Sequence, residues 1–167
     1  MEVVIRPIPN GAYVPSETDA IACTYDLDDS SPMNAVLLQF GLDREHFRKC
    51  ASMHAGDKFR VISHGDEKPF VITTSKTECW ESEGKATEQI LSTADIERCE
   101  SLCMTHFALI PGKFPEVAFA QYLQQVEQAK YHTQLKRVMV DVDARYVDAA
   151  KAVYQQVNAQ VLEAVKR

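Results

Sequence analysis

The chain has 167 residues, of which 46% are apolar and 25% charged, so it has the composition of one globular domain rather than of a disordered chain. Its formal net charge of -6 argues against a broad nucleic-acid surface, because affinity for a phosphate backbone comes mostly from clustered lysine and arginine. The amino terminus does not resemble a leader peptide, and no apolar run approaches the ~18 residues that span a bilayer. We therefore expect one cytoplasmic domain over residues 1–167, without membrane contact.

Two short strands are predicted at the start of the chain. Residues 2–8 are a β-branched run interrupted by proline, and residues 18–25 are apolar almost throughout, which is typical of a parallel strand buried on both faces. A serine–proline helix-start signal then predicts a helix over residues 32–40, and a second helix follows over residues 43–56.

Strands and a helix alternate through the middle of the chain. Residues 58–63 and 69–74 flank a polar turn and predict a hairpin or two neighbouring strands. After a long polar stretch, Thr93 is placed to cap a helix that continues to Cys103, and residues 105–111 predict the next strand.

The last third of the chain predicts a helix over residues 116–131, a strand over residues 136–142 and a final helix capped by Asp143. Apolar residues at three- and four-residue steps predict the core faces of the two helices: Val117, Phe119, Ala120, Leu123 and Val126 in the first, and Tyr146, Ala150, Val153, Val157, Val161 and Val165 in the last. Six strands interleaved with helices predict a three-layer α/β fold, with a mixed central sheet of about six strands and helices on both faces.

The residues that usually carry metal binding or catalysis form no recognisable group in the sequence. Five cysteines are an odd set without paired spacing, which favours reduced thiols over a disulfide framework. Cys99 and Cys103 would share one face of the predicted helix, but no second pair of ligands follows at zinc spacing. The five histidines are scattered, and none forms a dyad with a neighbouring nucleophile. We expect no metal and no cofactor, and whether the chain is an enzyme stays open, with a binding module favoured.

Ligands of open α/β sheets bind beyond the carboxyl ends of the strands, so the segments after Tyr25, Thr74 and Pro111 are the candidate binding segments. The first of them is acidic over Asp26–Asp29, and its carboxylates are suited to a cation or to ribose hydroxyls. A solvated loop with a helix cap is the favoured interpretation, because the other oxygen ligands of a cation shell are missing nearby.

The segment after Pro111 is basic and lies at the start of a predicted helix. Gly112 and Lys113 would stand where free backbone N–H groups and the helix dipole favour an anion such as phosphate. Two observations weigh against a phosphate, since the spacing is not that of a P-loop and Glu116 already places a negative charge at that helix end. Both interpretations remain open.

The order of elements and two short segments resemble the macro domain, a family of ADP-ribose-binding α/β modules. Asp19-Ala-Ile-Ala-Cys-Thr looks like the family's strand before the first ligand loop, and Phe107-Ala-Leu-Ile-Pro-Gly looks like the strand before the phosphate loop. Both glycine-rich segments are eroded, because residues 26–31 contain no glycine and the second loop is shortened. The resemblance implies ligand contacts from Cys23, Thr24, Tyr25 and Asp26 on one side, and from Pro111, Gly112, Lys113 and Phe114 on the other.

Two functions from different classes follow from this resemblance and its departures. The first is a macro-like module that binds ADP-ribose, a nucleotide or another small anion at the carboxyl ends of the strands. The alternative is a non-enzymatic interaction protein that retains the scaffold but has lost ligand binding, with a homodimer through the last helix as one form of it. We expect Val153, Val157 and Val161 to face the core rather than an exposed dimer seam. A metal-dependent hydrolase using Glu17, Asp26 or Asp28 is a weaker third hypothesis, because carboxylates alone specify no reaction.

Overall fold

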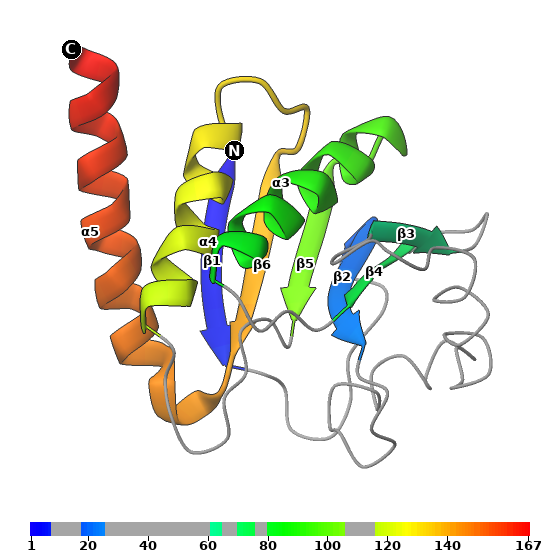
Figure 1. The fold of residues 1–167 in the computed structure, drawn as a ribbon, viewed down its shortest axis with the longest axis horizontal. Helices are drawn as coiled ribbons and strands as arrows, with labels where there is room; N and C mark the ends of the chain where they lie inside the picture. Colours follow the sequence, from blue (N-terminus) through cyan, green and yellow to red (C-terminus); the bar gives the residue numbers. More distant parts are fainter. Residues whose placement is uncertain (8–17, 26–60, 65–69, 76–79, 106–115) are drawn as a thin grey trace.

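A computed structural model describes the following residues, hereafter the described residues: 1–7, 18–25, 61–64, 70–75, 80–105 and 116–167 (Figure 1). They form these elements in chain order: β1 (Glu2–Pro7), β2 (Ala20–Tyr25), β3 (Val61–His64), β4 (Phe70–Ser75), α3 (Trp80–Ile96), β5 (Ser101–Thr105), α4 (Glu116–Ala129), β6 (Arg137–Val142), the 3-10 helix η2 (Ala144–Tyr146) and α5 (Val147–Lys166). None of these helices is both long enough and apolar enough to cross a bilayer.

The strands form one six-stranded sheet in the order β1-β6-β5-β2-β4-β3. Every neighbouring pair is parallel except β3 and β4, which are antiparallel, so the predicted mixed sheet of about six strands is confirmed. The apolar run of β2 explains its central position, because Ala20, Ile21 and Ala22 are fully buried and β-strand side chains alternate between the two faces.

Both faces of the sheet are buried. One face carries the main core, in which Ile5, Leu102 and Val138 pack with buried residues of α3, α4 and α5. Figure 1 shows α3 and α4 in front of that face, with α5 beside α4 and next to β1. On the opposite face Ile21 and Cys103 form a second apolar cluster with a neighbouring methionine, so that face is covered as well. The helices predicted over residues 32–56 lie outside the described residues.

The prediction of one helix that starts at Thr93 and continues to Cys103 was wrong. Helix α3 runs from Trp80 to Ile96, and Cys103 lies on β5 instead of on a helix. Thr93 lies inside α3, where its Oγ1 donates to the carbonyl of Gln89 at 2.8 Å instead of capping a helix start. The cause is that a short run of apolar residues fits a buried strand and a buried helix equally well, so periodicity alone did not separate them. The strand predicted over residues 105–111 falls on residues outside the described set, apart from Thr105.

The end of α3 is closed by a residue with left-handed backbone geometry. Arg98 has φ 57°, while the N–H of Cys99 donates to the carbonyl of Ala94 at 2.9 Å and the N–H of Arg98 donates to the carbonyl of Asp95 at 3.0 Å. This is the Schellman arrangement, in which glycine is the preferred residue because a Cβ atom is strained there.

Replacing Arg98 with glycine is therefore expected to stabilise the protein, because it removes a backbone strain of about 1 kcal/mol from the folded state. Part of this gain is offset, because glycine increases the conformational entropy of the unfolded chain. Urea denaturation should show that the free energy of unfolding rises by a few tenths of a kcal/mol, and by roughly 1 kcal/mol at most. Arg98→Ala is the matched control, because it removes the same side chain but keeps the Cβ atom. Equal stability of the glycine and alanine variants would contradict the strain.

Helices α4 and α5 bury most of the faces that the sequence predicts. Phe119, Leu123 and Val126 of α4 are buried in the core, as are Ala150, Val153, Val157 and Val161 of α5. Val117 and Val165 are corrections, because they are 52% and 58% exposed, at the first turn of α4 and the last turn of α5. Helix ends extend past the elements they pack on, so periodicity overstates their burial. Asp143 is also corrected, because it caps η2 by accepting from the N–H of Arg145, and α5 begins later, at Val147. Tyr146, predicted for the core face of the last helix, lies on η2 and is only partly buried.

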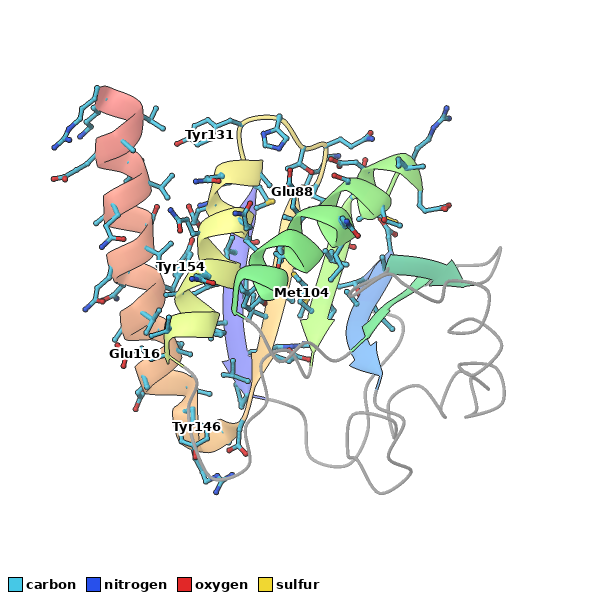
Figure 2. The ribbon with its side chains drawn as sticks, viewed as in Figure 1. Glu88, Met104, Glu116, Tyr131, Tyr146 and Tyr154 are labelled. Atoms are coloured by element: carbon cyan, nitrogen blue, oxygen red, sulfur yellow. The ribbon has the colours of Figure 1, made fainter. Side chains whose placement is uncertain are left out.

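A buried ion pair lies in the joint between α4 and α5. Lys130 Nζ is 2.7 Å from Glu127 Oε2, whose side chain is 2% exposed, and 3.4 Å from the hydroxyl of Tyr154 on α5. Figure 2 shows Tyr154 where α5 lies beside α4. Burial opposes the charge of Lys130, but the hydrogen bond and the charge of Glu127 outweigh it and raise the pKa of Lys130 above its usual value. Burial, together with Glu127, also raises the pKa of Tyr154.

Both shifts make the joint sensitive to alkali. The folded state holds the protons of Lys130 and Tyr154 more tightly than the unfolded chain does, so their contribution is complete below the unfolded pKa values and is lost as pH rises from about 10 upward. Denaturant titrations at pH 9 to 11, spanning roughly the ordinary tyrosine and lysine pKa values, should show falling stability. Tyr154→Phe removes one of the two titrating groups and should flatten this fall, whereas an unchanged slope would contradict the assignment.

Candidate functional site

The carboxyl ends of five parallel strands meet at one edge of the sheet, here called the carboxyl edge. Strands β2 and β5 are direct neighbours in it, with Cys23 beside Thr105. On the other side of β2, Thr24 lies beside Thr74 of β4. Adjacent strands lie about 4.8 Å apart, so the segments that follow β2, β4 and β5 depart from neighbouring points. Sheets of this kind bind ligands at this edge.

The predicted site residues divide into two groups. Cys23, Thr24 and Tyr25 are the last three residues of β2, at the carboxyl edge, and the structure describes their backbone. Asp26, with the acidic stretch Asp26–Asp29, lies outside the described residues, as does the segment of Pro111, Gly112, Lys113 and Phe114. The helix start predicted at Glu116 is confirmed, since α4 begins there with that acidic residue in its first turn. The structure thus fixes the strand end before one binding segment and the helix start after the other.

A polar turn after β6 stands at the same edge and was not among the candidate segments predicted from the sequence. Asp143 accepts hydrogen bonds from the side chain of Arg145 at 3.0 and 2.9 Å, and the guanidinium lies 5.2 Å from the ring centroid of Tyr146. The side-chain and backbone hydrogen bonds from Arg145 lower the pKa of Asp143 to about 2, so this carboxylate is charged at neutral pH. Figure 2 shows Tyr146 at this end of the molecule, away from Tyr131 at the other. The sequence feature that could have indicated this turn is the polar and aromatic run directly after the apolar strand.

A buried polar cluster of Arg6, Asp141 and Cys103 lies just behind the carboxyl edge. Arg6 Nε is 2.6 Å from Asp141 Oδ1, and the side chains of these two residues are 21% and 1% exposed. The Cys103 thiol donates to the other carboxylate oxygen, Oδ2, at 3.4 Å. The three residues come from β1, β6 and β5, which are consecutive strands in the sheet. Arg6 and Asp141 are the next-to-last residues of β1 and β6, and Cys103 is the middle residue of β5, two residues before its end.

Cys103 is chemically inert in this cluster. Burial raises the pKa of its thiol, and the charge of Asp141 raises it further, so the group stays protonated at any physiological pH. The thiolate is the reactive form of cysteine, and a buried thiol that donates to a carboxylate therefore cannot serve as a nucleophile. Cys103 and Cys99 are both buried, and within the described residues no group of three or more metal-binding side chains occurs.

Comparison of the sequence with family models and with curated proteins gives no match. The fold does match solved structures. A macrodomain variant from Oceanobacillus iheyensis with ADPR superposes with a TM-score of 0.61 at 16% identity, over 88% of this chain and 88% of that one. The macrodomain of Thermus aquaticus DarG gives 0.63 at 13% identity, over 84% and 98%. A Trypanosoma brucei macrodomain in complex with ADP gives 0.58 at 17% identity, over 84% and 63%.

Proposed function

Because this chain has the macrodomain fold, we propose that it is a binding module for ADP-ribose or a related nucleotide. One observation carries the proposal: β2 and β5 are neighbouring parallel strands, so the segment after Tyr25 and the segment that leads from Thr105 to Pro111 leave the sheet side by side at the carboxyl edge. Solved macrodomains of this fold have been obtained with ADP-ribose and with ADP, which supports a nucleotide as the ligand.

The residues proposed to form the two walls are those that the sequence indicates. Cys23 to Tyr25, which end β2, and Asp26, which follows them in the sequence, would line one wall, and Pro111 to Phe114, which precede α4, would line the other. Glycine is scarce in both segments, so the backbone cannot approach a diphosphate as closely as a glycine-rich loop does. Lys113 is the residue proposed to compensate, because an ammonium group close to a helix start adds its charge to the free N–H groups there.

Replacing Lys113 with alanine is expected to weaken nucleotide binding roughly tenfold, the effect of losing one charge-assisted contact to a phosphate. Thermal-shift titrations with ADP-ribose, ADP and inorganic phosphate measure this. The matched control is Lys136→Ala, which removes the same charge from an exposed lysine that precedes β6 at the opposite edge and pairs with Glu100. Equal affinity of the two variants would overturn the role of Lys113, and a wild-type protein that responds to no ligand would overturn the proposed function.

The alternative function is a protein-interaction scaffold without ligand binding, and a homodimer through the last helix is one form considered for it. Val153, Val157 and Val161 of α5 are buried in the core and are not available as a dimer seam. Light scattering tests self-association directly, and a monomer that binds ADP-ribose would favour the nucleotide-binding function over this alternative.

A further inference from the structure

Asp141 is the central residue of the polar cluster behind the carboxyl edge. Its two carboxylate oxygens have different partners on different strands: Oδ1 accepts from Arg6 on β1, and Oδ2 accepts from Cys103 on β5. Asp141 itself lies on β6, between those two strands, and its side chain is 1% exposed. One buried carboxylate therefore links three consecutive strands.

The position of this link along the strands is what connects it to the candidate site. Asp141 is followed in β6 only by Val142, after which the turn of Asp143 to Tyr146 begins. Cys103 is separated by only two residues from His106, the first residue of the segment that leads to Pro111–Phe114. The carboxylate thus lies one residue before the end of β6 and contacts β5 two residues before its end, close to the points where two segments leave the sheet at the carboxyl edge.

The ladder hydrogen bonds of a parallel sheet hold strands together along their length, but strand ends fray because each end residue has fewer ladder partners. A buried carboxylate with a charged and a neutral donor adds side-chain hydrogen bonds at that weak point, in a region where such bonds are strong. Apolar residues of similar size would fill the space equally well but would not fix the spacing of the strand ends.

We propose that Asp141 is a positioning residue for the candidate site: through Arg6 and Cys103 it holds the carboxyl ends of β1, β6 and β5 in the arrangement from which the binding segments depart. Its effect on ligand affinity rests on the proposed nucleotide-binding function. Its effect on the strand ends does not, because that effect is present in the ligand-free protein.

Amide hydrogen exchange of the ligand-free protein tests the positioning role. In Asp141→Asn, the amides of Met104, Thr105 and residues 142–146 should exchange about tenfold faster or more, while those of Leu102 and Val138, near the amino ends of the same strands, should not change. Val138→Ala is the control, because it removes buried side-chain volume from the same strand without touching the cluster. A uniform rise at both ends of the strands in Asp141→Asn would overturn the proposal, since that is the sign of a general loss of stability.

Ligand affinity then separates positioning from stability. The double variant Arg6→Met with Asp141→Leu replaces the ion pair with apolar side chains and should regain most of the thermal stability that Asp141→Asn loses. If Asp141 positions the site, the ADP-ribose affinity of this double variant should stay roughly tenfold below that of wild type, the effect expected when a supporting residue is removed. An affinity restored together with the stability would overturn the proposal. Wild type that fails to bind ADP-ribose overturns the proposed function instead, and the exchange measurement still decides the role of Asp141.

Discussion

Replacing Asp141 with alanine is expected to lower the free energy of unfolding by about 3 kcal/mol, because removing one partner of a buried ion pair leaves the other without its counter-charge. Arg6 would lose the carboxylate at 2.6 Å, and Cys103 would lose its acceptor. The value lies at the low end of the range for buried pairs, since the Arg6 side chain is 21% exposed and water can reach part of it. Urea denaturation followed by circular dichroism measures the change.

The same pair of strands provides the control. Glu2 of β1 pairs with Arg137 of β6 at 2.8 Å, but these side chains are 58% and 55% exposed. Glu2→Ala should therefore cost about 0.5 kcal/mol or less, because solvent screens exposed ion pairs. If Asp141→Ala lowered the free energy of unfolding no more than Glu2→Ala does, the buried cluster would not stabilise the sheet.

Replacing Leu123 with alanine is expected to cost about 3 kcal/mol, the middle of the range for leucine in a packed core. Leu123 is fully buried on α4, in the core cluster that joins that helix to α3, to α5 and to the sheet. Its loss would leave a cavity that the surrounding helices fill only in part. For a chain of this length the melting temperature should fall by roughly 6–12 °C.

Leu162→Ala provides the comparison for this second variant. Leu162 is a leucine of α5 that is 48% exposed, so removing it empties much less of the core. We expect it to cost about 1 kcal/mol or less. A fall for Leu123→Ala below about 1 kcal/mol would contradict the packing described for α4.

The sheet was the most predictable part of the fold. Apolar runs such as Ala20-Ile-Ala-Cys indicate strands covered on both faces, and the structure confirms such a strand as β2, which lies between β5 and β4 in the parallel part. Prolines and polar turns set strand boundaries to within one or two residues for β1 and β6. The pattern succeeded there because burial on two faces leaves few alternatives to a parallel strand.

The region from Ser75 to Thr105 was predicted badly for a physical reason. Its first part is polar, yet α3 begins at Trp80, since a helix needs only one apolar stripe to pack on a sheet. Its last part is apolar and short, so Cys103 fitted a helix face as well as a strand. Which was correct depended on contacts with β2 and β6, and these are distant in the sequence.

Of the candidate site, the sequence predicted the strand end at Tyr25 and the helix start at Glu116, which the structure confirms. The rule that ligands bind at the carboxyl ends of parallel strands pointed to the segments after Tyr25 and Pro111, and the segment at Pro111 lies outside the described residues. The buried cluster of Arg6, Asp141 and Cys103 could not be foreseen, because its members are up to 135 residues apart and meet only through strand pairing. Asp141 lies in an apolar run of the sequence, and a charged residue in a strand predicted to be buried was the one sequence feature that could have indicated the cluster.

Calorimetric titration of the wild-type protein with ADP-ribose measures directly whether the chain is a nucleotide-binding module. We expect saturable binding of one ADP-ribose per chain, since the carboxyl edge offers one place where the segments after β2 and β5 begin side by side. The absence of both binding heat and saturation at ADP-ribose concentrations up to about 1 mM would contradict this function. A Kd of about 1 mM corresponds to a binding free energy of roughly -4 kcal/mol.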